Sequence, residues 1–185
     1  MQRLNKFIAS SGLCSRRKAD ELIDSGKVAV NGKIVTELGF QVSTKDKITV
    51  DGNLIKPQKL EYYRFYKPAG YITTSDDEKG RKTIYDVIPP ELKMLKPVGR
   101  LDKDSTGLII MTNDGDLINE MTHPSIKVPK IYTVSVTGKV TSADGEKMHN
   151  GIEIETDTGE KRTAYAEIFP IEIDAKSSML RETLY

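Results

Sequence analysis

The sequence predicts a two-domain α+β protein, with a small helix-and-sheet domain at residues 1–58 and a larger domain with a largely antiparallel mixed sheet at residues 61–185. Near the N-terminus, apolar residues recur at helical spacing and are followed by two hairpin signals. The remainder has short strands and turns without the regular strand–helix alternation of a doubly wound sheet. Residues 1–60 hold 11 Lys and Arg against 6 Asp and Glu, whereas residues 61–185 hold 17 against 21. This split predicts that the basic front contacts a polyanion, although two ordinary solvated surfaces would also account for it.

The composition excludes several classes of protein. The 185 residues are 37% hydrophobic and 30% charged, which is typical of a soluble globular protein. No run approaches the roughly 18 apolar residues of a membrane span, and no apolar signal-peptide core follows Met1. Cys14 is the single cysteine, so an internal disulfide and a multi-cysteine zinc site are excluded. We therefore expect a cytoplasmic protein without a membrane partner.

Two helices are predicted at the front of the chain. Gly12 closes the first helix, Ser15 caps the second, and Gly26 ends it. The apolar positions at helical spacing are Leu4, Phe7, Ile8, Ala19, Leu22 and Ile23.

A small sheet follows these helices. The alternation from Val28 to Val30 leads into Asn31-Gly32, a strong two-residue hairpin signal, and then into Ile34 and Val35. A second strand, Lys47 to Val50, precedes a similar turn at Asp51-Gly52.

Three cations occupy the first turn of the second helix, namely Arg16, Arg17 and Lys18. The helix macrodipole disfavours cations there by roughly 0.3–1 kcal/mol each. Phosphates that screen these charges would offset that cost, so the placement favours nucleic-acid contact over a solvated helix face.

Three strings in this front segment together resemble the S4 RNA-binding module. They are Arg3-Leu4-Asn5-Lys6-Phe7-Ile8, Ser15-Arg16-Arg17-Lys18-Ala19 and Val28-Ala29-Val30-Asn31-Gly32. The resemblance covers roughly residues 2–50 and implies docking on structured RNA by shape and backbone contacts. The residues expected to contact RNA are Arg3, Lys6, Arg16, Arg17 and Lys18.

The second domain begins after a polar linker at Pro57 to Leu60. The predicted elements are a strand from Tyr62 to Tyr66, a turn at 67–70, a strand from Tyr71 to Thr74, a charged loop at 75–82, and a short helix from Thr83 to Ile88 stopped by Pro89-Pro90.

A polar loop holding Asp102 and Asp104 comes next and leads into the apolar strand Leu108 to Met111. A buried strand fixes the backbone of a carboxylate residue beside its end, and this position is common for a catalytic residue. The turn Asn113-Asp114-Gly115 then precedes a helix capped by Asp116. That helix bears Leu117, Ile118 and Met121 and ends near Pro124.

Three kinds of functional site are possible for Asp102. Residues 102–106 match the Asp-x-Asp-x-Thr pattern of haloacid-dehalogenase-type phosphatases, but residues 97–101 are not the buried hydrophobic strand which that fold requires. The same string resembles the start of a calcium loop, but its twelfth position is Asn113 instead of Glu. On spacing alone, a charged turn between two strands would also fit.

The third kind of site rests on a longer set of motifs. These are Tyr66-Lys67-Pro68-Ala69-Gly70, Gly99-Arg100-Leu101-Asp102 with Asp104, Thr106-Gly107-Leu108, Thr112-Asn113-Asp114-Gly115 and Lys130-Ile131-Tyr132-Thr133-Val134. In this order the set resembles the motifs of RNA pseudouridine synthases. With an S4-like front, the chain is similar to the RsuA/RluB type, which modifies bacterial ribosomal RNA.

This resemblance implies roles for individual residues. Asp102 is expected to act as nucleophile or base on a flipped uridine, with Arg100 helping to hold the extruded nucleotide's place and Tyr132 packing against the uracil. Lys67 and Lys130 are expected to frame the site or bind RNA phosphates, although Lys130 is equally consistent with a solvated strand-edge lysine. Because the isomerisation exchanges no electron or group, we expect no cofactor and no metal.

The expected partner is ribosomal RNA or a ribosome assembly intermediate, with large-subunit RNA favoured on overall similarity. The sequence does not predict the oligomeric state. The resemblance also implies a basic Glu-Gly-Arg-x-x-Gln-type motif after the strand from Met179 to Tyr185, so we expect a chain truncated at its C-terminus. Two alternatives follow: a catalytically inactive RNA-binding fragment, or a basic module that binds protein with the body as scaffold. Strong salt dependence of RNA binding would separate these two.

Overall fold

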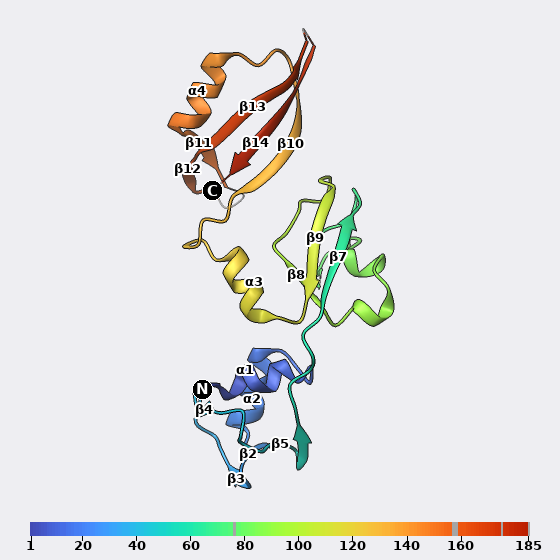
Figure 1. Ribbon diagram of the computed structural model, residues 1–185, viewed down its shortest axis with the longest axis vertical. Helices are drawn as coiled ribbons and strands as arrows, with labels where there is room; N and C mark the ends of the chain where they lie inside the picture. Colours follow the sequence, from blue (N-terminus) through green and yellow to red (C-terminus); the bar gives the residue numbers. More distant parts are fainter. Residues whose placement is uncertain (76, 157–158, 175, 185) are drawn as a thin grey trace. The chain divides into compact units, whose positions relative to one another are not determined.

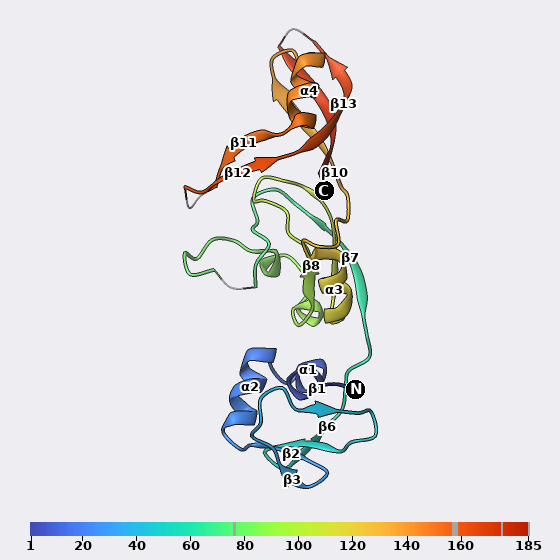
Figure 2. The ribbon, with the colours of Figure 1, turned by 90° about the vertical axis from the view of Figure 1, so that its left-hand side faces the viewer.

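The computed structural model describes residues 1–75, 77–156, 159–174 and 176–184. The chain forms two compact units, Met1–Met121 and Thr122–Tyr185 (Figure 1 and Figure 2).

The N-terminal part of the first unit contains two helices and two small antiparallel sheets. The helices are α1 (Leu4–Ser10) and α2 (Arg16–Asp24). One sheet pairs β1 (Gln2–Arg3) with β4 (Gln41–Val42). The other has the order β3-β2-β5-β6 and consists of β2 (Val28–Val30), β3 (Lys33–Ile34), β5 (Ile48–Val50) and β6 (Asn53–Ile55).

Local chemistry accounts for these elements and confirms the helices and hairpins that the sequence predicts. The Ser15 hydroxyl caps α2 by accepting a hydrogen bond from the Lys18 N–H at 3.2 Å. Asn31 and Gly32 have φ values of 52° and 81°, as a type I′ hairpin turn requires. One apolar core joins helices and sheet, and it consists of Leu4, Phe7, Ile8, Ala19, Ile23, Val28, Val30, Val42, Ile48 and Val50.

The rest of the first unit is built on a three-stranded antiparallel sheet with the order β7-β9-β8. Its strands are β7 (Tyr62–Lys67), β8 (Lys96–Val98) and β9 (Gly107–Thr112). Two 3₁₀ turns, η1 (Ile84–Asp86) and η2 (Pro90–Leu92), lie between β7 and β8 in the chain, and α3 (Gly115–Thr122) follows β9. The buried core of this part is Ile84, Ile88, Leu95, Ile109 and Met111.

Two predictions about the segment after β7 are wrong in detail. Tyr71 to Thr74 is not a strand: only an isolated parallel bridge joins Ile72 to Thr83, because the segment turns its hydroxyl-bearing Thr73 to another loop. The predicted helix from Thr83 to Ile88 is the single turn η1, which a reciprocal box between Thr83 and Asp86 caps. Residue 76 of the predicted charged loop lies outside the described residues.

The cap of α3 is also different from the prediction. Asp114, and not Asp116, accepts the free N–H groups: its Oδ1 bonds the amides of Asp116 and Leu117 at 3.0 and 3.1 Å. The helix starts at Gly115, so Asp114 occupies the capping position and Asp116 lies in the first turn. The Asp116 carboxylate is thereby left to form an ion pair elsewhere.

The second unit contains a three-stranded sheet of order β10-β14-β13, a hairpin and a helix. The sheet consists of β10 (Lys130–Thr137), β13 (Ala166–Ile173) and β14 (Ser177–Leu184), the hairpin of β11 (Ile152–Glu155) and β12 (Lys161–Ala164), and the helix is α4 (Ser142–Asn150). Helix α4 packs against β13, where a Cβ at Gly145 would lie 3.7 Å from Ile168 Cγ1 (Figure 2). Tyr185, the predicted end of β14, lies outside the described residues.

Every pairing between the named strands in the described residues is antiparallel, which confirms the α+β class with antiparallel sheets. Across the same residues, the helices are too short or too polar to cross a membrane.

Candidate active site

Asp102 lies on the exposed loop that leads into β9. Its neighbour Leu101 is half-buried against the core of the β7-β9-β8 part. Gly107, at the start of β9, has a φ of 150°, and a Cβ there would lie 3.5 Å from Leu101 Cδ1. The loop is therefore anchored immediately before Asp102 by an apolar side chain.

Thr73 fixes the backbone of Leu101 from both sides. Its Oγ1 donates to the Leu101 carbonyl at 2.7 Å and accepts from the Leu101 N–H at 3.1 Å. Thr73 is 7% exposed, so water is largely kept from both bonds. No local spacing in the sequence indicates this role for Thr73, because the contact joins residues 28 positions apart.

Lys67 supports the other side of the Asp102 loop. The side chain is fully buried, and its Nζ donates to the carbonyls of Pro68, Lys103 and Ser105 at 3.1, 3.1 and 2.7 Å. An ammonium has three N–H donors, and these three carbonyls use all of them. The Gly70 N–H adds a further bond to the Lys103 carbonyl at 2.8 Å.

Of the two roles predicted for Lys67, framing the site and binding RNA phosphates, this geometry supports the first. A buried ammonium whose donors all point at backbone carbonyls has none left for a phosphate. Burial lowers the pKa of Lys67 below its ordinary value, and the nearby Asp104 and Asp102 charges partly offset that shift. Lys67 therefore frames the loop and contributes a positive charge beneath the two carboxylates.

The arrangement holds the Asp102 backbone between two anchored residues while its carboxylate faces solvent. Leu101 is held by Thr73, and Lys103 is held by Lys67 and Gly70. The Ser105 N–H also bonds the Asp102 carbonyl at 3.2 Å. An exposed carboxylate on a fixed backbone can act as a nucleophile or as a base toward a docked substrate. Arg100, two residues earlier, is exposed on the same loop.

Tyr132 and Lys130 lie in the second unit, whereas Asp102 and Arg100 lie in the first. Tyr132 is half-buried on β10, opposite Glu182 of β14. Lys130 is exposed at the start of β10, and its Nζ donates to the Val128 carbonyl at 3.3 Å. Each unit thus carries two of these four predicted residues.

The predicted RNA-binding cations lie on α1, on α2 and next to them. Arg3, Arg16, Arg17 and Lys18 are exposed. Lys18 forms an exposed ion pair with Glu21 at 2.6 Å, and no acidic residue lies in the first turn of α2. Lys6 is paired with Asp116 of α3 at 2.6 Å, so a phosphate would have to displace that carboxylate. A metal site is not indicated: the described residues hold no group of three His, Cys, Asp or Glu side chains that could bind an ion.

Two family models match the chain. The model described as RNA pseudouridylate synthase matches residues 61–180, and the S4 domain model matches residues 2–48. These matches confirm both resemblances that the motifs carry.

Individual proteins and structures agree with the family match. The chain is 39% identical over 185 residues to the ribosomal large subunit pseudouridine synthase B of Bacillus subtilis, covering 100% of this chain and 75% of that protein. It is 44% identical over 155 residues to an uncharacterized RNA pseudouridine synthase of Aquifex aeolicus, covering 83% of this chain and 62% of the relative. A crystal structure of a pseudouridylate synthase superimposes with a TM-score of 0.62 at 29% identity, covering 100% of this chain and 77% of that one.

The Asp102 loop thus lies within the synthase match at residues 61–180. This match follows the N-terminal part that matches the S4 domain. The chain belongs to the RNA pseudouridylate synthase family of isomerases, in its RsuA/RluB type with an S4 domain.

Proposed function

We propose that this protein isomerises a uridine of bacterial ribosomal RNA to pseudouridine, with large-subunit RNA as the substrate and Asp102 as the reacting carboxylate. The supporting observation is the Asp102 loop itself, whose backbone is fixed on both sides by Thr73 and Lys67 while the carboxylate is exposed. The Bacillus subtilis relative, named for the large subunit, supports the choice of RNA.

The reaction breaks the C1′–N1 bond of uridine, rotates the uracil and forms a C1′–C5 bond, with loss of the C5 proton to solvent. In the proposal, Asp102 attacks the sugar or removes a ribose proton. Arg100 takes the place of the flipped nucleotide in the RNA, and Tyr132 packs against the uracil. Flipping costs a few kcal/mol, which contacts to the phosphates offset. No residue in this scheme requires a cofactor.

We further propose that residues 1–58 hold the RNA while residues 61–185 carry out the reaction. Arg3, Arg16, Arg17 and Lys18 are exposed, and within the described residues the one carboxylate that pairs with any of them is that of Glu21, on Lys18. Lys6 exchanges Asp116 for a phosphate when RNA binds, and Lys130 contacts the backbone near the target. The partner is ribosomal RNA or an assembly intermediate, which implies a cytoplasmic location.

The test is tritium release from ribosomal RNA labelled at C5 of uridine, with small- and large-subunit RNA assayed separately. Asp102→Asn should reduce release by at least about 10³-fold. Asp104→Asn is the matched control, because it makes the same change in the same exposed loop, and it should retain release. The Bacillus subtilis relative serves as the positive control for the RNA.

Each outcome decides one part of the proposal. Release only from small-subunit RNA would overturn the choice of substrate. Equal release by wild type and Asp102→Asn would overturn the role of Asp102. Absence of release from both RNAs, where the positive control releases, would overturn the enzyme and leave an RNA-binding protein.

A further inference from the structure

We refer to the N-terminal part of the first unit, which contains α1, α2 and strands β1 to β6, as the S4 part. A short segment of the same unit, Gln58–Tyr62, connects it with the β7-β9-β8 sheet. We refer to this segment as the strap. At its N-terminal end, the Gln58 N–H donates to the Ser10 carbonyl, at the end of α1, at 2.8 Å. The Gln58 side chain covers Gly12, where a Cβ would approach it to 2.3 Å. The strap is thereby fixed to the S4 part.

At its other end, the strap is fixed by the last residue of β9, Thr112, and by the two residues that follow it, Asn113 and Asp114. Asn113 binds the strap twice: its Nδ2 donates to the Lys59 carbonyl and its Oδ1 accepts from the Glu61 N–H, both at 2.9 Å. The fully buried Thr112 hydroxyl donates to the Glu61 carbonyl at 2.6 Å. The Tyr62 hydroxyl donates to Asp114 Oδ2 at 2.7 Å. One amide side chain therefore satisfies both a backbone donor and a backbone acceptor of a connecting segment.

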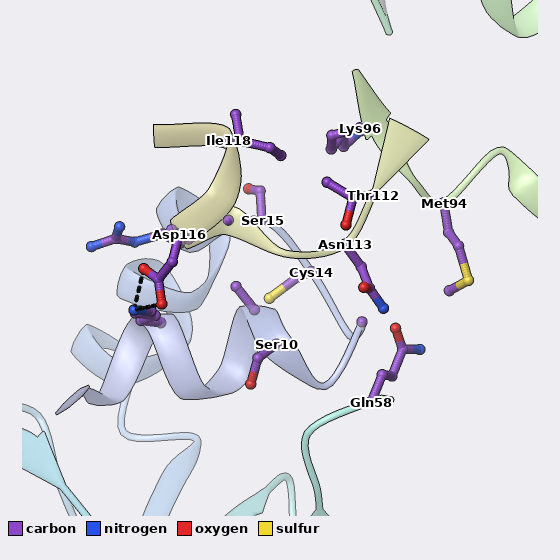
Figure 3. Close-up of a pocket in the computed structure, with 15 residues that line it drawn as sticks. Ser10, Cys14, Ser15, Gln58, Met94, Lys96, Thr112, Asn113, Asp116 and Ile118 are labelled. Carbon is purple, nitrogen blue, oxygen red and sulfur yellow. Dashed lines mark hydrogen bonds and ion pairs between the residues drawn. The ribbon is translucent and has the colours of Figure 1, made fainter. Parts of the chain in front are cut away.

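The strap borders a cavity of about 470 Å³ between the two parts of the unit (Figure 3). Gln58 and Asn113 line one part of it, and Asp116 lies in the part where it meets Lys6 (Figure 3). That ion pair is a second connection, but its side chains are 36% and 75% exposed. Exposed pairs contribute little and are screened by salt, whereas both bonds to the Glu61 backbone are partly buried, so these bonds of the strap are the stronger constraint.

Strand β9 connects the strap with the reacting carboxylate. Its first residue follows the Asp102 loop, and its last, Thr112, is bonded to the strap. Six residues of extended chain span about 20 Å. The sheet fixes this strand on both sides, because β7 and β8 pair with it.

We propose that Asn113 is a positioning residue that fastens the strap, so that the S4 part holds RNA at one set distance and orientation from Asp102. This proposal rests on the proposed function for its consequence, but the strap itself is a property of the free protein. Asn113 touches neither RNA nor the reacting atoms in this scheme, and it acts through the backbone of residues 59–61.

The first experiment needs no activity. Spin labels are placed at Lys33→Cys in the S4 part and at Lys93→Cys in the part built on the β7-β9-β8 sheet, both exposed positions, in a Cys14→Ser background. Asn113→Ala should broaden the measured distance distribution at least about twofold. Asn113→Asp keeps the acceptor for Glu61 and should broaden it less. Asn53→Ala, in an exposed hairpin, is the matched control and should leave it unchanged. An Asn113→Ala distribution as narrow as wild type, with an intact unfolding transition, would overturn the proposal.

The second experiment compares two RNA substrates, a long RNA that spans both parts and a short stem–loop that carries only the target. Asn113→Ala should lower kcat/KM on the long RNA by about tenfold and leave kcat on the short RNA within about twofold. Equal losses on both RNAs would indicate a merely structural role and would overturn the positioning role. If wild type acts on neither RNA, the proposed function fails, whereas the distance measurement still decides the strap.

Discussion

The first turn of α2 and the Asp102 loop present charged groups in opposite ways. Arg16 and Arg17 are exposed, and within the described residues neither guanidinium has a partner in the fold. The carboxylate of Asp102 is also exposed, but the backbone that carries it is bonded to buried Thr73 and Lys67. Cations that bind a polyanion need reach and number, because phosphate contacts are sequence-independent and many. A group that reacts with one atom needs a fixed backbone, since small displacements of a catalytic group greatly lower the reaction rate.

The largest effect on stability is expected when the hydrogen bonds that fix the Asp102 loop are removed. Lys67→Met keeps the apolar stem but removes the ammonium donor from the carbonyls of Pro68, Lys103 and Ser105, of which the Lys103 carbonyl keeps its bond from the Gly70 N–H. We expect the free energy of unfolding in urea to fall by about 3 kcal/mol, and tritium release with it. Lys103→Met, in the same loop with an exposed side chain, should stay within about 0.5 kcal/mol. Equal stability of the two variants would show that Lys67 does not hold the loop.

The next effect should appear in RNA affinity alone. The double variant Arg16→Gln/Arg17→Gln should weaken RNA binding by at least about tenfold and reduce the slope of log K against log salt by about one to two. Its unfolding transition should not change, since both side chains are exposed. Lys33→Gln/Lys45→Gln removes two other exposed cations of the same part and serves as the control. Equal salt slopes for the two double variants would contradict a phosphate-binding role for the first turn of α2.

A smaller effect is expected from the hydrogen bonds between Thr73 and Leu101. Thr73→Val preserves the shape of the side chain and removes both hydrogen bonds to Leu101. We expect a loss of about 1–2 kcal/mol in unfolding free energy and a fall in kcat that exceeds any change in KM. The exposed Thr36→Val is the control. A KM effect with kcat preserved would place Thr73 in RNA binding instead.

The smallest effect concerns the cap of α3 and depends on pH. The Tyr62 hydroxyl first, and the Leu117 N–H next, hold the pKa of Asp114 below its ordinary value. A carboxyl with a lowered pKa stabilises the fold above the ordinary Asp pKa of about 4, and this contribution is lost as the pH falls through the lowered value. Asp114→Asn should therefore cost less than about 1 kcal/mol at pH 7, because Asn is also a good cap, and the cost should be smaller at pH 3.

The control for that variant is Glu120→Gln, which lies on the exposed face of the same helix. It should show no difference between the two pH values. A cost of Asp114→Asn that is as large at pH 3 as at pH 7 would show that shape, and not the carboxylate charge, matters at this position.

Structural features that depend on a few neighbouring residues, such as helix caps and tight turns, could be predicted from the sequence. Ser15 caps α2, and Asn31-Gly32 makes a turn with positive φ at both positions, because these effects depend on the residues themselves. The strand before Asn113 was equally clear, since an apolar run between polar turns has few other interpretations. Local signals also mislead by a residue or two, as in the choice between Asp114 and Asp116.

The hydrogen bonds between residues far apart in the sequence could not be predicted. The bonds from Thr73 to Leu101 and from Asn113 to Glu61 span 28 and 52 residues, and no local spacing encodes them. The segment from Tyr71 to Thr74 alternates like a strand whether its bonds go to a neighbouring strand or, as found, to a loop. The family motifs indicated that Lys67 and Asn113 belong to the site region, but not that one is buried beneath it and the other fastens a linker.

The sequence separation of the strap bonds has a consequence for the protein during its synthesis. The apolar core of the S4 part is complete within Leu4–Val50, so this part can fold as soon as it leaves the ribosome. Asn113 is made several seconds later, at about 5–20 residues per second. Throughout that interval the nascent S4 part lacks the hydrogen bonds from Asn113 to the strap. The cations that we propose to bind RNA are therefore in place before the chain has built β9 and Asn113, which we propose to set their orientation.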